Sequence, residues 1–484
     1  MDGEKVAAPI DESNPAETGI VDFEKDDPAN PLNWPKPYKW AMVILVACLS
    51  AMVTDPSQPA VNHHRSASLA QILTDFHSDN TLYRTLIVSI WELGEIVGPL
   101  VWGPLSEVYG RRPVLNIANF FFVAFFVGTV LSTNIQILVA FRFLSGTATA
   151  ASPIGPGIVR DLFAEEHRGR AMSIMSMSTA LGPLLGPIVG SYLGQNAGWR
   201  WTFWLPTIAY GFLSLLFLAV YRETYKVSIL EKKTRQRQRE TGDYSLRSKY
   251  ETDDTALRKL YKTAIRPLSL LVRSPALMLI TLFICIVYGY TYLIMTTIAP
   301  VFQDVYAFSE GASGLAFLGL CLGLVSGSIL CSFLLDHYVQ LAKKRAGAIT
   351  PEQRLPPVLV ACMFMPGGLF LFGWSTAYHV QFIVPIIGTA VIGFALAATS
   401  ISLQSYIVDA FGIYAVSAVS AMLVPRNATA AFLPLAGPPL YSALGYGWGN
   451  SVLGFIALAF VPMPLLFMKF GERIRKCSAH LLVE

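Results

Sequence analysis

Long runs of apolar residues alternate with short polar connectors along most of this chain. The runs are about 20 residues long, the length of an α-helix that crosses the roughly 30 Å hydrocarbon core of a bilayer. They lack the alternating pattern of membrane strands, and lipid cannot hydrogen-bond to exposed backbone groups, so helices are expected. The pattern predicts twelve spanning helices, over residues 40–60, 84–104, 113–132, 135–157, 170–194, 201–221, 275–298, 311–335, 357–377, 380–401, 411–434 and 450–469.

Two polar, charge-rich segments interrupt this pattern, at residues 1–39 and 222–274. The first has no apolar core of the kind a signal peptide needs. The second separates six predicted helices from the next six. The predicted parts are an N-terminal tail (1–39), a six-helix bundle (40–221), a central loop (222–274), a second six-helix bundle (275–469) and a C-terminal tail (470–484).

Lysine and arginine residues gather in every second connector. If the N-terminus is cytosolic, 31 of the 36 basic residues fall in cytosolic segments, while Arg65, Arg84 and Arg200 fall in external ones. Basic connectors stay on the cytosolic side during membrane insertion. Both termini are therefore predicted to be cytosolic.

Composition supports a membrane protein and argues against several other classes. Charged residues make up 14% of the chain, whereas a soluble domain carries about a quarter, so most of the surface is expected to face lipid. The seven histidines and six cysteines show no metal-ligand spacing, and no nucleotide-binding G-x-x-x-x-G-K-[ST] loop occurs. We expect neither an enzyme nor an ATP-driven pump, and no cofactor, metal or nucleic-acid partner.

The connector between the second and third predicted helices reads GPLSEVYGRRP, residues 103–113. Gly103 permits close helix packing, and Gly110 permits a tight turn. Glu107 can cap a helix or latch two elements together. Arg111 and Arg112 can pair with acidic side chains or with lipid phosphates.

The fifth predicted helix contains STALGPLLGPIVGSYLG. Gly182, Gly186 and Gly190 allow neighbouring helices to approach closely. Generic packing of small residues also explains these glycines. Pro187 after Gly186 favours the more specific interpretation, because a Gly-Pro pair bends a helix and plain packing does not need a bend.

These two segments resemble motifs of the major facilitator superfamily, in its branch of drug:proton antiporters with twelve spans. Residues 103–113 are similar to the family's loop signature, with Val108 where a basic residue is usual. The fifth span is similar to the antiporter motif, with Ser173 and Ser191 where glycines are usual. DPANPLNWP (27–35) and GWRWTFWL (198–205) look like the fungal multidrug-exporter group.

The resemblance implies an all-α membrane protein with the major facilitator fold, twelve helices in two six-helix bundles that rock about a midplane site. It implies a monomeric, proton-coupled antiporter that exports drugs, toxins or a secondary metabolite through the plasma membrane, with the vacuolar membrane as an alternative. The expected partners are a small organic substrate, protons and membrane lipid. An uptake permease and a polyamine exporter share the fold and stay open as alternatives.

Charged residues inside spans need a reason, because each costs at least about 2.5–3.5 kcal/mol near the bilayer centre. The candidates for proton coupling are Glu92, Glu95, Arg142 and Asp55. At about 1.5 Å per residue, Glu92 and Arg142 lie roughly 12 and 10 Å from the outer ends of their predicted helices. Our hypothesis is that Glu92 or Glu95 loads a proton and that Arg142, which matches the family's proton-handling arginine, tunes it. The alternative is a static ion pair that orients the helices.

Tyr288, Tyr292, Gln404 and Arg426 are the candidates for the substrate cavity. The resemblance implies a cavity lined by the first, fourth, seventh and tenth spans. Aromatic surface with few fixed polar groups suits greasy or planar organic molecules better than sugars. Packing roles for the tyrosines, and a snorkelling role for Arg426, remain alternatives.

Overall fold

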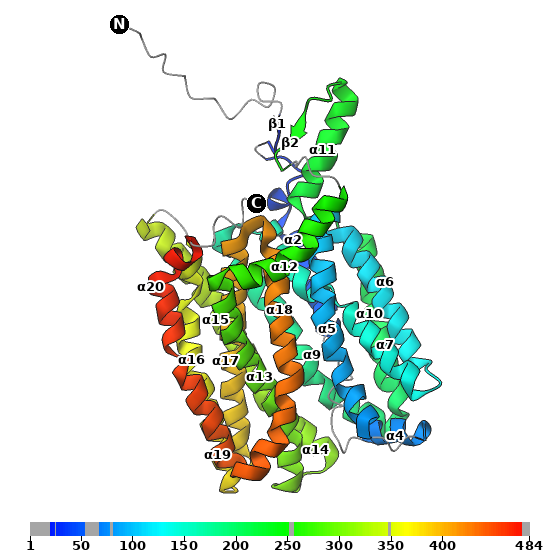
Figure 1. Ribbon diagram of the computed structural model, residues 1–484, viewed down its shortest axis with the longest axis vertical. Helices are drawn as coiled ribbons and strands as arrows, with labels where there is room; N and C mark the ends of the chain where they lie inside the picture. The colour runs from blue at the N-terminus through cyan, green and yellow to red at the C-terminus, as the bar shows by residue number, and fades with distance from the viewer. Residues whose placement is uncertain are drawn as a thin grey trace.

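The computed structural model describes residues 20–24, 26–53, 67–77, 81–250, 256–346 and 350–476. They form a helical body whose long helices run from one end to the other (Figure 1). The end drawn uppermost in Figure 1, here called the upper end, holds the start of α2 (Lys36–Val53) and the end of α20 (Pro462–Lys476). It also holds α11 (Lys226–Thr241), α12 (Ala256–Arg273) and a parallel pair of two-residue strands, β1 (Ile20–Val21) and β2 (Arg247–Ser248).

The helices of the N-terminal half follow the predicted spans, with two differences: α4 lies outside every predicted span, and one predicted span is broken. Besides α2 they are α4 (Ala67–Asp75), α5 (Thr81–Tyr109), α6 (Arg111–Val130), α7 (Ile135–Thr147), α8 (Ala151–Leu162), α9 (Arg168–Ala197) and α10 (Trp199–Val220). The predicted span 135–157 is broken into α7 and α8. The break follows Thr147, whose carbonyl oxygen accepts a hydrogen bond from the Trp102 indole at 2.7 Å. The last carbonyl of α7 is thus paired with a side chain from α5, a contact that a hydropathy pattern cannot predict.

The C-terminal half contains α13 (Pro275–Asp304), α14 (Glu310–Leu315), α15 (Phe317–Ala346), α16 (Pro356–Ala377), α17 (Ile383–Phe411), α18 (Ala415–Phe432), α19 (Gly437–Ala459) and α20. Helix α17 continues ten residues past the predicted span 380–401. Its polar residues Ser402, Gln404 and Ser405 are buried between helices, so the end of the apolar run is not the end of the helix. The predicted span 450–469 bridges α19 and α20, and Gly445 interrupts α19 with φ +70°.

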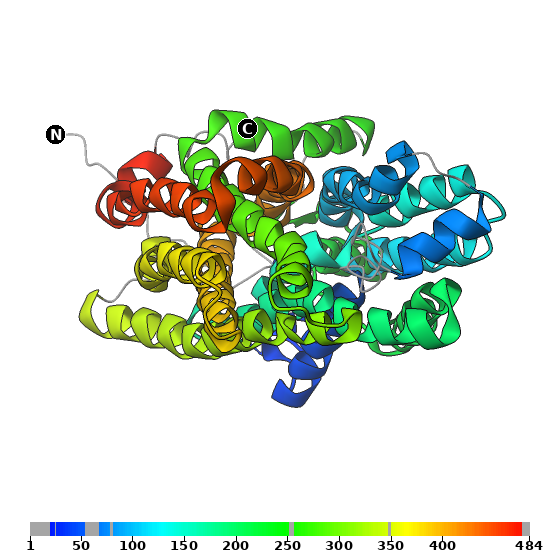
Figure 2. The same cartoon turned by 90° about the horizontal axis from the view of Figure 1, so that it is seen from below.

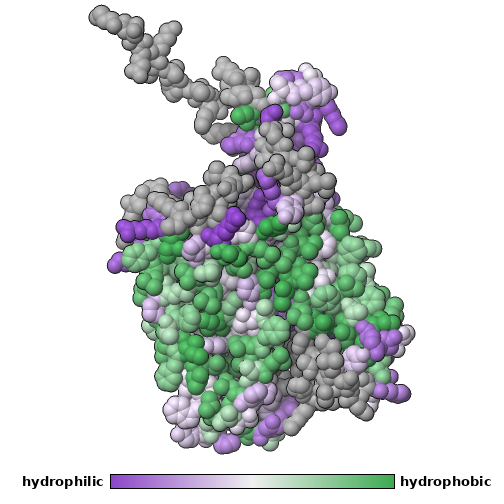
Figure 3. Space-filling view, in the orientation of Figure 1, coloured by the Kyte–Doolittle hydropathy of each residue, from purple (hydrophilic) through white to green (hydrophobic). Residues whose placement is uncertain are grey.

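On the face drawn in Figure 3, an apolar belt covers the long helices and is bounded by hydrophilic residues at both ends. Seven stretches of the described chain are long and apolar enough to span a membrane, and the last, Ile383–Ile474, contains several helices. Large apolar side chains on the outside of this belt are exposed, among them Leu215 of α10 and Leu322 of α15. Taking α7 with α8, α14 with α15 and α19 with α20 as one span each, and leaving out α4, α11 and α12, the described helices give twelve spans in two bundles of six. The fold is an all-α membrane fold.

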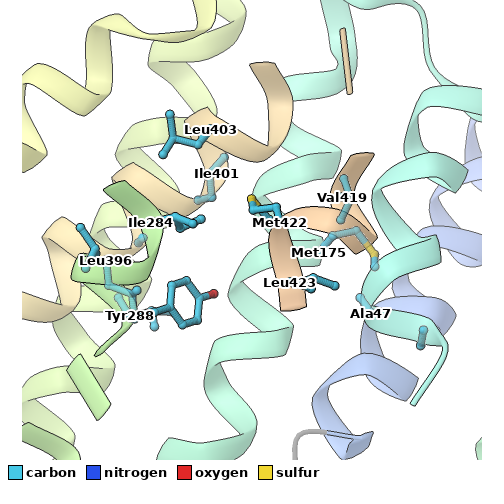
Figure 4. Packing of buried hydrophobic residues seen from close by; sticks show 14 of the residues in the cluster. Ala47, Met175, Ile284, Tyr288, Leu396, Ile401, Leu403, Val419, Met422 and Leu423 are labelled. Carbon is cyan, nitrogen blue, oxygen red and sulfur yellow. The ribbon is translucent and has the colours of Figure 1, made fainter. Parts of the chain in front are cut away.

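The two bundles lie side by side and meet along two long contacts (Figure 2). Helix α5 packs against α18, and α9 packs against α15 and α17. Between the bundles, Figure 4 shows Met175 of α9 beside Val419, Met422 and Leu423 of α18. All four side chains are buried. The apolar core is thus continuous from one bundle to the other.

Candidate functional site

A sharp turn at Gly110 joins α5 to α6 at the upper end. Gly110 has φ +96°, a conformation that L side chains rarely adopt. The backbone N–H groups of Arg111 and Arg112 both donate to the carboxylate of Glu223, at 2.9 and 3.1 Å. This carboxylate satisfies N–H groups in the first turn of α6 and lies at the positive end of its dipole. A Cβ on Gly110 would come within 2.5 Å of Glu223 Oε2.

The two arginines after this turn have different environments. The Arg111 guanidinium is fully buried, 3.4 Å from Asp161 at the end of α8, and donates to Ser106 Oγ at 2.7 Å. Its Cζ atom lies 4.3 Å from the centre of the Tyr225 ring. Arg112 is exposed and donates to the Leu218 carbonyl at 3.3 Å. Arg111 therefore ties α5, α6 and α8 together, while Arg112 remains at the surface.

Glu107 connects the two bundles. It is buried on α5, and its carboxylate accepts hydrogen bonds from Ser417 N at 2.8 Å and Ser417 Oγ at 2.6 Å, in the first turn of α18. Arg266 Nη1 of α12 lies 3.3 Å from the same carboxylate. One turn earlier on α5, a Cβ on Gly103 would lie 2.1 Å from Ser420 Oγ. The absence of a side chain at Gly103 thus permits the approach of α18 on which the Glu107 contact depends.

A second polar contact joins the bundles on the α9–α15 side, and sequence reasoning missed it. Asp409 of α17 accepts from Arg168 Nη1 at 2.6 Å and from Arg354 Nε at 2.8 Å. Arg354, also fully buried, donates to the Glu165 carbonyl of the other bundle at 2.6 Å. Asp336 of α15 accepts from the Gly169 backbone N–H at 2.9 Å. Both inter-bundle contacts lie at the upper end (Figure 1).

The two contacts use equivalent places in the two halves. In the first half an acid lies near the upper end of the second long helix (Glu107), an arginine at the start of the third (Arg111) and an acid at the end of the fourth (Asp161). In the second half the corresponding residues are Asp336, Arg354 and Asp409. This spacing is a sequence signal that could have revealed the second set, because Asp336 and Arg354 flank a connector as Glu107 and Arg111 do.

Glu92, Glu95 and Arg142 are all buried where α5 crosses α7. The crossing is made by Gly94 and Gly146. A Cβ on Gly94 would lie 2.8 Å from Gly146 Cα. At about 1.5 Å per residue, Glu92 and Arg142 lie roughly 3 and 6 Å below this crossing, at similar depth, because both helices run toward the upper end. The Arg142 guanidinium also lies 5.4 Å from the centre of the Phe203 ring of α10.

On the other side of α5, a polar group of the second bundle approaches the same level. Asn427 Nδ2 of α18 donates to the Glu95 carbonyl at 2.9 Å. Asn427 Oδ1 accepts from Arg426 Nε and Nη2, at 3.0 and 2.8 Å. Arg426 in turn places its Cζ atom 4.4 Å from the centre of the Tyr288 ring of α13. A chain of contacts therefore links the Glu95 backbone to an arginine and an aromatic ring of the C-terminal bundle.

The remaining candidates for the cavity are on α13 and α17 of the C-terminal bundle. Tyr288 and Tyr292 are stacked with ring centres 6.4 Å apart. In Figure 4, Tyr288 extends from α13 toward α18. Gln404 Oε1 of α17 accepts from Ser176 Oγ of α9 at 3.1 Å, so this side chain also bridges the bundles. Aromatic surface, one guanidinium and amide groups thus lie between the two halves.

Helix α9 runs without interruption from Arg168 to Ala197 and includes Gly182, Gly186, Pro187 and Gly190. Gly182 and Gly186 are buried. Helix α9 packs against α2 of its own bundle and against α15 of the other. The motif therefore lies on a helix at the junction of the bundles. Asp55, the fourth proton-coupling candidate, lies outside the described residues.

Comparison with known proteins gives one consistent result. The family model of the Major Facilitator Superfamily matches residues 40–424. Over 461 residues the chain is 43% identical to "MFS-type transporter atr4" of Stereocaulon alpinum, covering 95% of this chain and 82% of that protein. It is 39% identical to "Efflux pump radE" of Floropilus chiversii, covering 94% and 85%. It is 40% identical to "MFS-type transporter penM" of Penicillium rubens, covering 94% and 89%.

Solved structures of low sequence identity share the fold. The proton:xylose symporter XylE is 16% identical, with a TM-score of 0.65, and the match covers 90% of this chain and 96% of that one. The human organic anion transporter MFSD10 is 16% identical, with a TM-score of 0.60, and the match covers 90% and 100%. At such identities the likeness concerns the arrangement of helices alone.

Proposed function

Because the chain belongs to the major facilitator superfamily, it is a multi-pass membrane transporter and not an enzyme, and we propose that it exports small organic molecules in exchange for protons. In this proposal the upper end faces the cytosol and the protein works as a monomer in the plasma membrane. The basic connectors at the upper end support this orientation. The name of one relative, an efflux pump 39% identical to this chain, supports the direction of transport.

The observation that carries proton coupling is the pair of buried acids on α5. Glu92 and Glu95 are 7% and 8% exposed, one turn apart, at the crossing with the arginine-bearing helix α7. Burial in a membrane helix makes the charged form of a carboxylate unfavourable, whereas a nearby guanidinium stabilises it. Whether the carboxylate holds a proton therefore depends on how close a guanidinium lies. A movement of one bundle against the other changes the surroundings of α5. Proton binding and the conformational change are thereby linked.

We propose that the polar contacts at the upper end hold one of the two states that such an exchange needs. In the conformation described here, Glu107 holds Ser417 while Asp409 holds Arg168 and Arg354. Both contacts join the bundles on the proposed cytosolic side and would have to break for a substrate to enter from the cytosol. We propose that protonation at Glu95 or Glu92 shifts the balance between this latched state and the state open to the cytosol.

The central residues favour a planar or greasy substrate. The stacked Tyr288 and Tyr292 offer aromatic surface, and Arg426 offers a buried positive charge beside it. Aromatic rings and a guanidinium suit conjugated organic molecules, including weak acids. The same guanidinium opposes a polycationic substrate, which weighs against the alternative of polyamine export.

The test is transport by the purified protein in proteoliposomes, with an imposed pH difference and a panel of fluorescent planar dyes. We expect substrate to move against its gradient when protons flow the other way, and this movement to stop when an ionophore collapses the pH difference. Glu95→Gln and Glu92→Gln are tested singly. At least one of the two variants should lose proton-driven transport but still let the substrate equilibrate down its own concentration gradient.

The matched control is Glu240→Gln, a change of the same kind on exposed α11. Equal transport by the wild type with and without a pH difference would refute proton coupling. Substrate movement in the same direction as protons would instead identify an uptake permease.

A further inference from the structure

Helix α12 lies on the outside of the molecule at the upper end, across the junction of the bundles (Figures 1 and 2). It packs against α5 of one bundle and against α18 and α13 of the other. Its inward side carries the buried residues Thr263, Pro267 and Leu270. This helix thus belongs to neither bundle and touches both.

The outward side of α12 is an apolar stripe formed by Tyr261, Ile265, Leu268 and Val272. These side chains are 69%, 42%, 47% and 78% exposed. With 3.6 residues per turn, the four fall within about 60° of one another, opposite the buried side. A helix on a water-covered surface would carry polar side chains there. The stripe therefore needs an apolar environment.

The sequence of α12 indicates which environment that is. It carries five basic residues and no acidic one, the basic residues being Arg258, Lys259, Lys262, Arg266 and Arg273. Lys262 and Arg273 are exposed beside the stripe. Figure 1 and Figure 3 share one orientation, and together they place α12 at the upper border of the apolar belt. An apolar stripe flanked by positive charge at this level is typical of a helix that lies in the interface of an anionic bilayer.

One residue of α12 reaches the inter-bundle contact. Arg266 Nη1 lies 3.3 Å from Glu107 Oε2, and its guanidinium stacks 4.1 Å from the centre of the Tyr414 ring next to α18. Glu107 is the carboxylate that holds the first turn of α18. The position of α12 therefore bears directly on the contact between the bundles.

We propose that α12 is a binding surface for anionic lipid, and that the bound lipid holds Arg266 against Glu107 and so stabilises the latched state. The stripe enters the acyl region, and Lys262 and Arg273 contact lipid phosphates. The effect on the latch rests on the transport cycle proposed above, whereas lipid contact does not. Transporter activity then depends on the charge of the leaflet that α12 occupies.

Lipid contact is tested by fluorescence quenching in nanodiscs. Tyr261→Cys and Val272→Cys are each labelled with bimane in a protein whose native cysteines are replaced. Lipids brominated along the acyl chain should quench both labels. Tyr244→Cys is the control, because Tyr244 is 77% exposed on the part of the central loop that projects away from the belt, and its label should not be quenched. If α12 is folded and the labels are not quenched, the proposal is refuted. It is also refuted if the stripe is covered by a second copy of the chain instead of by lipid.

The effect on the latch is tested by pulsed spin-label distances between Ala164→Cys and Lys344→Cys, exposed positions at the upper ends of the two bundles. Adding anionic lipid to a neutral bilayer should enrich the shorter distance. Lys262→Gln/Arg273→Gln should remove most of this response. Each basic residue near an anionic surface contributes about 1 kcal/mol, so each can change the ratio of the two populations by at most about fivefold. Arg235→Gln/Arg239→Gln on exposed α11 should keep it. Distances that do not respond to lipid charge in the wild type refute the link to the latch, whether or not transport proves to be proton-driven.

Discussion

Two positions at the upper end, Gly103 and Gly110, need glycine for different reasons. Gly110 combines a positive φ with a Cβ position 2.5 Å from Glu223 Oε2, so both backbone and space exclude a side chain. Gly103 is constrained by space alone, because Ser420 of the other bundle occupies the volume of its Cβ. The first constraint acts within one bundle, and the second acts between bundles.

Gly110→Ala should therefore destabilise the protein. With φ +96° and ψ 164°, Gly110 is in a backbone region that is essentially limited to glycine and costs about 1–3 kcal/mol for another residue, and the approach to Glu223 adds to this. The denaturation temperature in detergent should fall. Gly211→Ala on α10 is the control, because a Cβ there meets nothing within 4 Å and alanine favours a helix by about 0.8–1 kcal/mol. A denaturation temperature that does not fall in Gly110→Ala would contradict the argument.

The pairing of Arg426 with Tyr288 makes a second prediction at this scale. A desolvated guanidinium over an aromatic ring is worth about 2 kcal/mol. Tyr288→Leu should raise the half-saturating concentration for a planar substrate about tenfold or more, because the ring and the orientation of Arg426 are both lost. Tyr288→Phe keeps the ring and should transport nearly as well. Equal defects in the two variants would show that the hydroxyl, not the ring, matters.

At the scale of elements, the segment before α2 is docked on the central loop. Strand β1 pairs with β2, and three acids of this segment form ion pairs with basic residues of the loop. These pairs are Asp22–Lys249, Glu24–Arg237 and Asp27–Lys233. Burial by itself raises the pKa of Asp27, but its hydrogen bond and ion pair with Lys233 outweigh this, and the net pKa is below the usual 3.8. The pKa of Asp22 is lowered by Lys249 in the same way.

This docking should weaken in acid. Because the pKa values of Asp22 and Asp27 are depressed, the contribution of these two carboxylates is complete above about pH 4 and is lost as the pH falls through the lowered values. Asp27→Asn should remove part of the docking at neutral pH and increase amide hydrogen exchange over residues 20–35. Asp26→Asn is the control, because Asp26 is exposed and asparagine tolerates its φ of +63°. The same exchange rates in both variants would argue against the ion pair.

At the scale of the whole molecule, the two inter-bundle contacts lie on different helix pairs but join the same two bodies. Glu107 acts between α5 and α18, while Asp409 and Asp336 act between the C-terminal bundle and the start of α9. If each bundle moves as a rigid unit, loss of one contact must loosen the other. Hydrogen bonds to a charged group contribute about 1.5–3 kcal/mol.

Glu107→Gln should therefore separate the bundles at the opposite contact. The Ala164–Lys344 label pair should show a longer distance, with the open population raised by about one order of magnitude or more, since 1.4 kcal/mol is a factor of ten. Glu240→Gln on α11 should leave the distance unchanged. A change confined to the α5–α18 side would show that the bundles do not move as rigid units.

Much of the molecule follows from the sequence because lipid imposes simple rules. A spanning helix must be apolar and about 20 residues long, so hydropathy locates the helices and yields the all-α fold. The motifs at Gly103–Arg112 and Gly182–Gly190 also stand out, because each needs particular small or charged residues at fixed spacing. The acids of α5 were recognisable for the same reason, since a charge in an apolar run is conspicuous.

Other features were decided by tertiary contact alone. The break after Thr147 depends on the Trp102 indole, and the length of α17 depends on polar residues buried against other helices. Ser417, which donates to Glu107, and Arg168, which donates to Asp409, each lie in the opposite bundle from their acid, more than 200 residues away along the chain. Hydropathy measures how a segment meets lipid, whereas a buried ion pair depends on which helices adjoin. That adjacency exists only once both bundles have packed together.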